Sequence, residues 1–222
     1  MYAPEIQLHR VAHSVAAPRS VSRAGGWLAI RRATEQTRDS TSPGGFTVAL
    51  LLTSLVALPM EAVMSIPSRL SSYLDQRGAR YETCVHKPSR TSAETARAAQ
   101  VLPHQLAKSV IVEDDAGCVM AVVPADKTVM LGHLSRLLGR KELRLSDETR
   151  IAILFEDCDR GAVPPVGMAW GIETVVDDEL EANELVYMEG GDHECLLRMS
   201  HEQFHELMIA ARHGHFCKQP LH

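Results

Sequence analysis

Two apolar segments with strand-like alternation, residues 109–113 and 118–123, flank the sequence Asp114-Asp-Ala-Gly117. Apolar runs on either side of a short Asp- and Gly-containing segment are typical of a β-hairpin. The spacing therefore predicts an antiparallel strand pair joined by a four-residue loop. Further strands are predicted at residues 81–86, 174–176, 185–188 and 194–199.

Helix signals separate these strands. A Ser or Thr followed three residues later by Glu or Gln forms a capping box, and a glycine commonly ends a helix. The helices predicted on this basis are 66–77 ended by Gly78, one from the Thr91–Glu94 capping box to about Gln100, 131–138 ended by Gly139, one capped by Ser146, and one behind the Ser200–Gln203 capping box. Because strands and helices mix without strict βαβ alternation, the predicted fold class is α+β with a largely antiparallel sheet.

Charge divides the chain near Met64. Residues 1–63 contain six Arg, no Lys and four acidic residues, and they lack clear hydrophobic periodicity. Residues 64–222 contain 17 basic and 24 acidic residues, so their net charge is −7. We expect residues 1–63 to be a poorly ordered extension, residues 64–212 to form one domain, and residues 213–222 to be a flexible tail.

The extension contains an apolar run, FTVALLLTSLVAL, at residues 46–58. It is shorter than the roughly 20 residues that a membrane-spanning helix needs, so no membrane partner is expected. A signal peptide is an alternative because Arg residues precede the run and Pro59 ends it, although the charged lead would be unusually long. Another alternative is that translation starts at Met64 behind a mis-assigned leader. The function is therefore expected beyond Met64.

Composition excludes two classes of protein. A formal net charge of −5 excludes the broad basic surface of a non-specific nucleic-acid-binding protein. The five cysteines are widely spaced and form no Cys-x-x-Cys motif, which is typical of reduced thiols rather than of a disulfide framework. The sequence therefore predicts a cytoplasmic protein.

His201-Glu202-Gln-Phe-His205 matches the His-Glu-x-x-His signature of zinc proteases, in which the glutamate is the general base. The match starts in the first turn of its predicted helix, where the side chains are solvated, and no acidic residue lies beyond residue 206. Other ligands could come from the C-terminal residues only if these fold back, namely His213, His215 and Cys217. A zinc metallohydrolase using His201 and His205 is therefore the less favoured reading, and no metal or cofactor is expected.

The segment Gly161-Ala-Val-Pro-Pro-Val-Gly167 combines two prolines with flanking glycines. Prolines stiffen the backbone, and glycines allow conformations or close approaches that side chains forbid. A rigid loop of this kind can present backbone groups to a ligand, but a plain connector has the same composition.

Lys108 and His193 are ambiguous on spacing alone. Lys108 lies between an apolar helical turn and an apolar strand, where it is either a solvated lysine or a cation at the mouth of a site. His193 follows a Gly190-Gly191-Asp192 turn and is a surface histidine unless it reaches the same site. No phosphate-binding glycine motif and no Ser or Cys nucleophile in a familiar setting accompanies them.

Taken in order, these segments resemble the YbaK-like aminoacyl-tRNA deacylase family, which includes the editing domain inserted in prolyl-tRNA synthetase. The resemblance runs from about Met64 to Met208 and rests on the strand end at His86, the helix behind Thr91, and four further segments. These are AKSVIVEDDAGCVMAVVPAD, DCDRGAVPPVG, VVDDEL and VYMEGGDHECLLRMS.

The resemblance implies one compact domain with a mixed, mostly antiparallel, curved and barrel-like sheet flanked by helices. It also implies metal-independent hydrolysis of the ester that joins a mischarged amino acid to tRNA. By residue, it implies catalytic roles for Lys108, Gly161, Pro165 and His193. The residues expected to bind substrate are His86, Ala162, Val163, Pro164 and Gly167.

A free-standing trans-editing hydrolase is the preferred function. An aminoacyl ester is already activated, so a positioned water and backbone N–H groups that stabilise the oxyanion can suffice. Because residues 64–222 have a net charge of −7, the protein is expected to bind mainly the tRNA acceptor end or to gain affinity from an aminoacyl-tRNA synthetase partner. The alternative is a non-catalytic module that binds aminoacyl-tRNA or a nucleotide, in which Lys108 contributes affinity only.

Overall fold

The structure is a computed structural model that describes residues 66–220. The predictions for residues 1–63, including the apolar run at 46–58, lie outside the described residues, as do residues 221 and 222. In the described part of the chain, no helix has the length and apolar character needed to cross a membrane.

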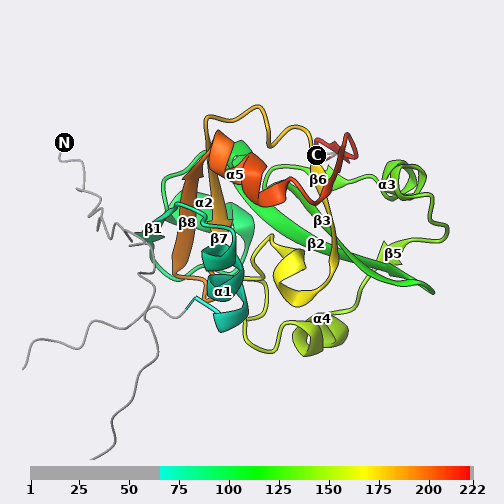
Figure 1. The fold of residues 1–222 in the computed structure, drawn as a ribbon, viewed down its shortest axis with the longest axis horizontal. Helices are drawn as coiled ribbons and strands as arrows, with labels where there is room; N and C mark the ends of the chain where they lie inside the picture. Colours follow the sequence, from blue (N-terminus) through cyan, green and yellow to red (C-terminus); the bar gives the residue numbers. More distant parts are fainter. Residues whose placement is uncertain (1–65, 221–222) are drawn as a thin grey trace, which may run out of the picture. The chain divides into compact units, whose positions relative to one another are not determined.

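The described residues form five α-helices and ten strands (Figure 1). The helices are α1 (Ser68–Gln76), α2 (Ser92–Ala98), α3 (Leu131–Leu138), α4 (Glu148–Leu154) and α5 (His201–Met208). The strands are β1 (Glu82–Val85), β2 (Leu106–Asp114), β3 (Gly117–Pro124), β4 (Thr128–Val129), β5 (Arg144–Leu145), β6 (Glu173–Asp177), β7 (Leu185–Glu189), β8 (Cys195–Ser200), β9 (Arg212–Gly214) and β10 (Cys217–Lys218).

The main sheet is mixed. Its strand order is β1-β8-β7-β2-β3-β6-β9, with β5 paired to β2, while β10 and β4 form a separate two-stranded sheet. In the main sheet the β2–β7, β3–β6 and β6–β9 ladders are parallel and the other four are antiparallel. The β10–β4 ladder is also antiparallel. The predicted α+β class with a mixed, mostly antiparallel sheet is therefore confirmed.

Side chains alternate between the two faces of the sheet, as the pleat requires. In β2, Ala107 and Ile111 join the larger hydrophobic cluster, which α1 and α5 cover. Val112 points the other way, into a cluster completed by α3 and Phe216. Leu106 packs with α2 in a third cluster. Both faces of β2 are thus buried, which makes this strand the centre of the fold.

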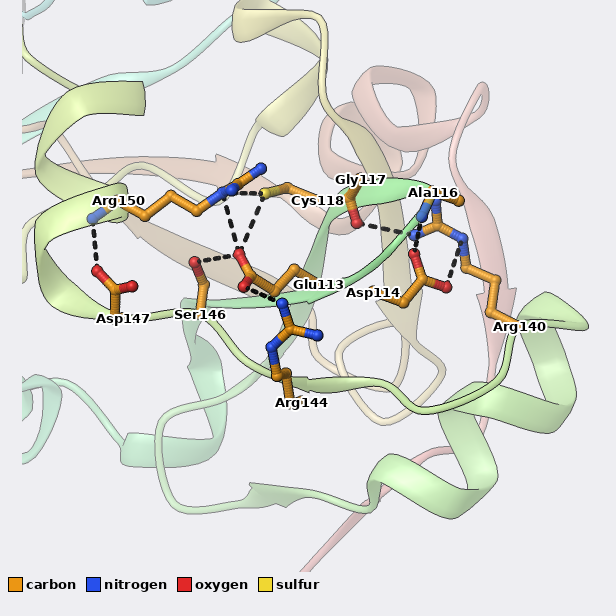
Figure 2. Close-up of polar contacts among 10 residues, drawn as sticks. All are labelled: Glu113, Asp114, Ala116, Gly117, Cys118, Arg140, Arg144, Ser146, Asp147 and Arg150. Atoms are coloured by element: carbon orange, nitrogen blue, oxygen red, sulfur yellow. Dashed lines mark hydrogen bonds and ion pairs between the residues drawn. The ribbon is translucent and has the colours of Figure 1, made fainter.

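The predicted helix caps are largely confirmed. The Thr91 side chain accepts a hydrogen bond from the Glu94 N–H, the Ser200 side chain accepts one from the Gln203 N–H, and Gly139 ends α3 in the left-handed conformation. The cap of α4 is shifted by one residue, because Asp147 accepts from the Arg150 N–H at 2.8 Å. Ser146 donates instead to the buried Glu113 (Figure 2).

The hairpin between β2 and β3 is tighter than predicted. The two strands pair as far as Asp114 opposite Gly117, so Asp115 and Ala116 alone form the turn. Asp114 Oδ1 accepts a hydrogen bond from the Ala116 N–H at 2.9 Å, and Gly117 has a φ of +127°. The expected four-residue loop is therefore wrong, because the outer two positions belong to the strands.

The C-terminal segment is part of the fold over residues 213–218, where a flexible tail was expected. β9 extends the main sheet beside β6, and β10 pairs with β4. Phe216 is fully buried, and its N–H donates to Asp177 Oδ2 at 2.8 Å. The expectation fails because the partners of this segment lie far away in the sequence and leave no local signal.

Candidate functional site

A buried carboxyl group lies where β7 ends. Glu189 is only 3 % exposed, and its Oε1 accepts a hydrogen bond from Thr95 Oγ1 at 2.9 Å. The Ser89 hydroxyl lies 2.8 Å from the Thr95 hydroxyl. Burial raises the pKa of Glu189 above its ordinary value, and the hydrogen bond from Thr95 opposes this shift only in part. We refer to His86, Ser89, Thr95, Glu189 and His193 as the Glu189 cluster.

Two histidines of the Glu189 cluster are held by backbone carbonyls. His86 Nδ1 lies 2.9 Å from the Lys87 carbonyl oxygen, and His193 Nε2 lies 2.6 Å from that of Arg160. Since a carbonyl oxygen can only accept, these ring nitrogens carry the hydrogens. The opposite nitrogens, Nε2 of His86 and Nδ1 of His193, are buried without a hydrogen-bond partner among residues 66–220, as is Glu189 Oε2.

Gly161 packs directly against His193. Its φ is +90°, and a Cβ atom placed there would lie 3.3 Å from His193 Cε1. His193 itself has a φ of +61°, which is uncommon for a residue with a side chain. The two expected catalytic residues Gly161 and His193 are therefore in contact, and both hold strained or glycine-specific backbone conformations.

The rest of the loop faces inward. The side chains of Ala162, Val163, Pro164 and Pro165 are buried, so this loop can offer a ligand mainly its backbone. Val163 is tied to β2, because its carbonyl oxygen accepts from Ser109 Oγ at 2.8 Å. Within the described residues, the N–H groups of Gly161 and Val163 donate to no other protein group.

Gly167, at the end of this loop, has a packing role. A Cβ atom at this position would lie 2.6 Å from Thr174 Oγ1 and 3.0 Å from Met120 Cβ, so any side chain would clash with the sheet. The residue is buried, and its side-chain position points at the core. Close approach of backbone to sheet therefore accounts for this glycine.

Lys108 lies in β2 next to Ser109, but its side chain is on the opposite face. Its Nζ donates to the Ala125 carbonyl oxygen at 3.0 Å. Partial burial lowers the pKa of Lys108, and the nearby Asp126 carboxylate raises it. In this conformation Lys108 makes no polar contact with the Glu189 cluster. Its neighbour Ala107 pairs with Met188, so Lys108 nevertheless lies beside the end of β7.

Glu189, Thr95 and Ser89 were not singled out from the sequence. The available signal was an acidic residue at the end of an apolar strand, directly before Gly190-Gly191. Nothing local shows that this carboxyl is buried, because its hydrogen-bond donor Thr95 is 94 positions away. Sequence reasoning therefore found the two histidines of the cluster but missed the group between them.

The C-terminal residues fold back, as the zinc metallohydrolase hypothesis requires, and place His213 beside His201 and His205. His201 Nδ1 and His205 Nδ1 lie 3.6 and 3.2 Å from Glu181 Oε2, and His213 Nδ1 lies 3.6 Å from Glu181 Oε1. The imidazoles thus surround a carboxylate. Glu202, the general base in the zinc reading, is exposed.

A second group of metal-ligating side chains lies near the C-terminus. Asp177, Glu179 and His215 are the described residues whose candidate ligand atoms all fall within 4.8 Å of one another. Both Asp177 oxygens already accept backbone N–H groups, from Glu179 and Phe216, and Glu179 forms an ion pair with Lys127. The arrangement therefore anchors the C-terminal segment to β6.

Known proteins agree with this fold. The crystal structure of hypothetical protein APE2540 aligns with a TM-score of 0.61 at 29 % identity, covering 68 % of this chain and 99 % of that one. A designed scaffold protein for epitope presentation aligns with a TM-score of 0.58 at 28 % identity, over 69 % of this chain and 96 % of that one. A candidate trans-editing enzyme for prolyl-tRNA synthetase shares the fold with a TM-score of 0.59 at 24 % identity, over 68 % of this chain and 95 % of that one.

No curated protein matches the sequence. The family model for the aminoacyl-tRNA editing domain matches residues 86–207, which is more than half of the chain. The match begins at His86 and includes Lys108, the Gly161–Gly167 loop, Glu189 and His193. The resemblance seen in the sequence is therefore confirmed, and the chain belongs to the family of aminoacyl-tRNA editing domains.

Proposed function

We propose that this protein is a free-standing hydrolase that removes mischarged amino acids from tRNA by cleaving the aminoacyl ester. The observation that carries the proposal is the match to the editing-domain family over residues 86–207, which spans the whole candidate site. The substrate is then the tRNA acceptor end with its amino acid, and an aminoacyl-tRNA synthetase is a natural second partner. Translation fidelity in the cytoplasm is the corresponding role.

The Gly161–Gly167 loop stabilises the transition state of ester hydrolysis. Attack of water on the ester carbonyl produces a tetrahedral oxyanion, and preorganised N–H donors stabilise such a charge. Within residues 66–220 the N–H groups of Gly161 and Val163 donate to no protein group, so they are available for this purpose. Pro164 and Pro165 keep the loop stiff, so these donors need no reorganisation during the reaction. The 2′-hydroxyl of the substrate can help to orient the water.

Charged residues around the loop suit a nucleotide. Arg90 and Arg160 are exposed, and their backbone carbonyls lie beside Gly161 and His193. Their guanidinium groups can pair with phosphates of the acceptor end. Lys108 is proposed to turn from the Ala125 carbonyl towards the terminal phosphate or the aminoacyl carbonyl. Local contacts of this kind reconcile tRNA binding with the net charge of −7 on residues 64–222.

Deacylation of a panel of labelled aminoacyl-tRNAs tests the proposal. We expect the wild type to release one or two mischarged amino acids selectively. We expect Lys108→Ala to lower kcat/KM for these substrates by about 10- to 100-fold, because a charge-assisted contact is lost. Lys141→Ala removes an exposed lysine outside the candidate site and is expected to behave as the wild type.

One outcome would contradict the proposed hydrolase, and a second would contradict only the role proposed for Lys108. Wild-type protein that binds the aminoacyl-tRNAs but never accelerates their hydrolysis would identify a binding module. Full activity in Lys108→Ala would remove the catalytic role of the lysine and leave hydrolysis to the loop and the Glu189 cluster.

The histidines around Glu181 justify a separate test of the zinc metallohydrolase. If His201, His205 and His213 held a catalytic metal, untagged protein would contain stoichiometric zinc, and a chelator would abolish hydrolysis. We expect the rate of deacylation to be unchanged by EDTA and by His205→Ala. Loss of activity in both experiments would favour the metal.

A further inference from the structure

We propose that the Glu189 cluster binds the free α-ammonium group of the aminoacyl ester. This inference rests on the proposed function and specifies what the site recognises on its substrate. Three buried atoms carry it, namely Glu189 Oε2, His86 Nε2 and His193 Nδ1, none of which has a hydrogen-bond partner within residues 66–220.

All three atoms have the same hydrogen-bonding character. Carbonyl oxygens fix the hydrogens of His86 on Nδ1 and of His193 on Nε2, so the free nitrogens of the neutral rings can only accept. In its ionised form, which a bound cation would stabilise, the Glu189 carboxylate is also only an acceptor. Buried polar atoms are rarely left unpaired, because each costs free energy when it is removed from water. These three atoms thus lack a donor, and an ammonium group offers three N–H donors.

The negative charge of the Glu189 carboxylate also favours an ammonium group as the ligand. The Glu189 carboxyl lies in a buried setting that disfavours its ionised form, and the Thr95 hydroxyl supports only one of its oxygens. A bound cation would compensate the negative charge and supply the missing hydrogen bond to Oε2. A neutral amide in the same place would provide no charge and at most one donor.

The cluster is positioned to meet the substrate. Gly161 contacts the His193 ring and is exposed, and the Arg160 residue that holds this ring is exposed as well. The α-amino group of an aminoacyl ester is only one carbon from the ester carbonyl. A carbonyl held by the N–H groups of Gly161 and Val163 would therefore bring the ammonium group close to His193 and Glu189.

The functional consequence is discrimination between free and acylated amino groups. An aminoacyl-tRNA would be hydrolysed, whereas a tRNA carrying an N-acylated amino acid, such as a peptidyl or formylated residue, would be spared. The test compares the hydrolysis of one edited aminoacyl-tRNA with that of its N-acetyl derivative. For each substrate, the rate enhancement is the enzymatic rate divided by the spontaneous rate of the same substrate. The full-length wild type is expected to favour the free amine by at least roughly 10-fold.

The matched variants are Glu189→Gln and Glu194→Gln. Glu189→Gln keeps the shape and the acceptor for Thr95 but removes the charge and places N–H donors where the ammonium would bind. It should lower kcat/KM for the free-amine substrate by roughly 10- to 100-fold and change the N-acetyl substrate far less. Glu194→Gln removes an exposed charge in the same turn and should preserve the discrimination.

The outcomes separate this inference from the proposed function. If the wild type hydrolyses neither substrate, the proposed hydrolase fails. If it hydrolyses both at equal enhancement, the hydrolase stands and the ammonium site is overturned. The comparison in the wild type needs no variant, so a folding defect in Glu189→Gln cannot obscure it. Equal losses on both substrates in a folded Glu189→Gln protein would also overturn the inference.

Discussion

The contact between Gly161 and His193 sets the geometry of the candidate site. Gly161 has a φ of +90°, where a residue with a side chain is strained, and its missing Cβ leaves room for the His193 ring. That ring is in turn fixed by the Arg160 carbonyl at 2.6 Å. The glycine thus keeps both the loop N–H groups and the histidine in place.

Gly161→Ala is expected to lower the free energy of unfolding by about 1–2 kcal/mol, because alanine is disfavoured at positive φ. It should also reduce deacylation, since the new methyl group pushes against His193. Urea denaturation and single-turnover kinetics measure the two effects. Gly132→Ala is the control, because nothing lies within 4 Å of the position of its Cβ. Equal stability and activity in both variants would contradict this account of Gly161.

At the scale of elements, the buried carboxylate of Glu113 connects β2, β5 and α4. Glu113 of β2 accepts from Arg144 of β5 at 2.9 Å, from Ser146 at 2.9 Å, and pairs with Arg150 of α4 at 3.0 Å (Figure 2). The arginines are largely exposed while Glu113 is buried. The carboxylate thus holds the connection between α3 and α4 against the tip of the hairpin.

Glu113→Gln is expected to destabilise the protein by about 1–2 kcal/mol, because two charge-assisted contacts become neutral or are lost. The exposure of both arginines keeps the effect below that of a fully buried ion pair. The measurement is the midpoint of thermal unfolding, with Asp115→Asn in the exposed turn as the control. An unchanged midpoint in Glu113→Gln would show that the three elements are held together by apolar packing alone.

The sequence predicts elements better than it predicts the contacts between them. The caps at Thr91 and Ser200 follow from side chains that bond to backbone three residues away, so a short window contains the whole signal. The role of Ser146 could not be predicted in this way, because its partner Glu113 is 33 positions earlier. For the same reason, the hydrogen bond between Glu189 and Thr95 at the centre of the candidate site could not be predicted from the sequence.

On the scale of the whole molecule, the C-terminal segment closes one side of the sheet. β9 lies beside β6, and Phe216 fills the cluster between α3 and the sheet. Asp177, fully buried, receives the Phe216 N–H. Residues far apart in sequence create this arrangement, so the segment could not be distinguished from a flexible tail by its composition.

Phe216→Ala is expected to cost about 3–5 kcal/mol of stability, because a large aromatic side chain is removed from a fully buried position. Chemical denaturation of the full chain provides the measurement. Ile209→Ala, at a position that is 65 % exposed, should change stability by about 0.5 kcal/mol or less. A similar small change for both variants would mean that residues 213–218 contribute little to the fold.

The central claim is that the full chain hydrolyses the ester of mischarged tRNA, and isotope labelling of the product tests it most directly. Aminoacyl-tRNAs of the panel are incubated with the wild type in H₂¹⁸O, and the released amino acids are analysed by mass spectrometry. The account predicts selective release, faster than the spontaneous rate, with ¹⁸O in the amino-acid carboxyl group and a tRNA that can be charged again. Decay of every panel member at its spontaneous rate, or loss of the amino acid together with the terminal nucleotide, would contradict it.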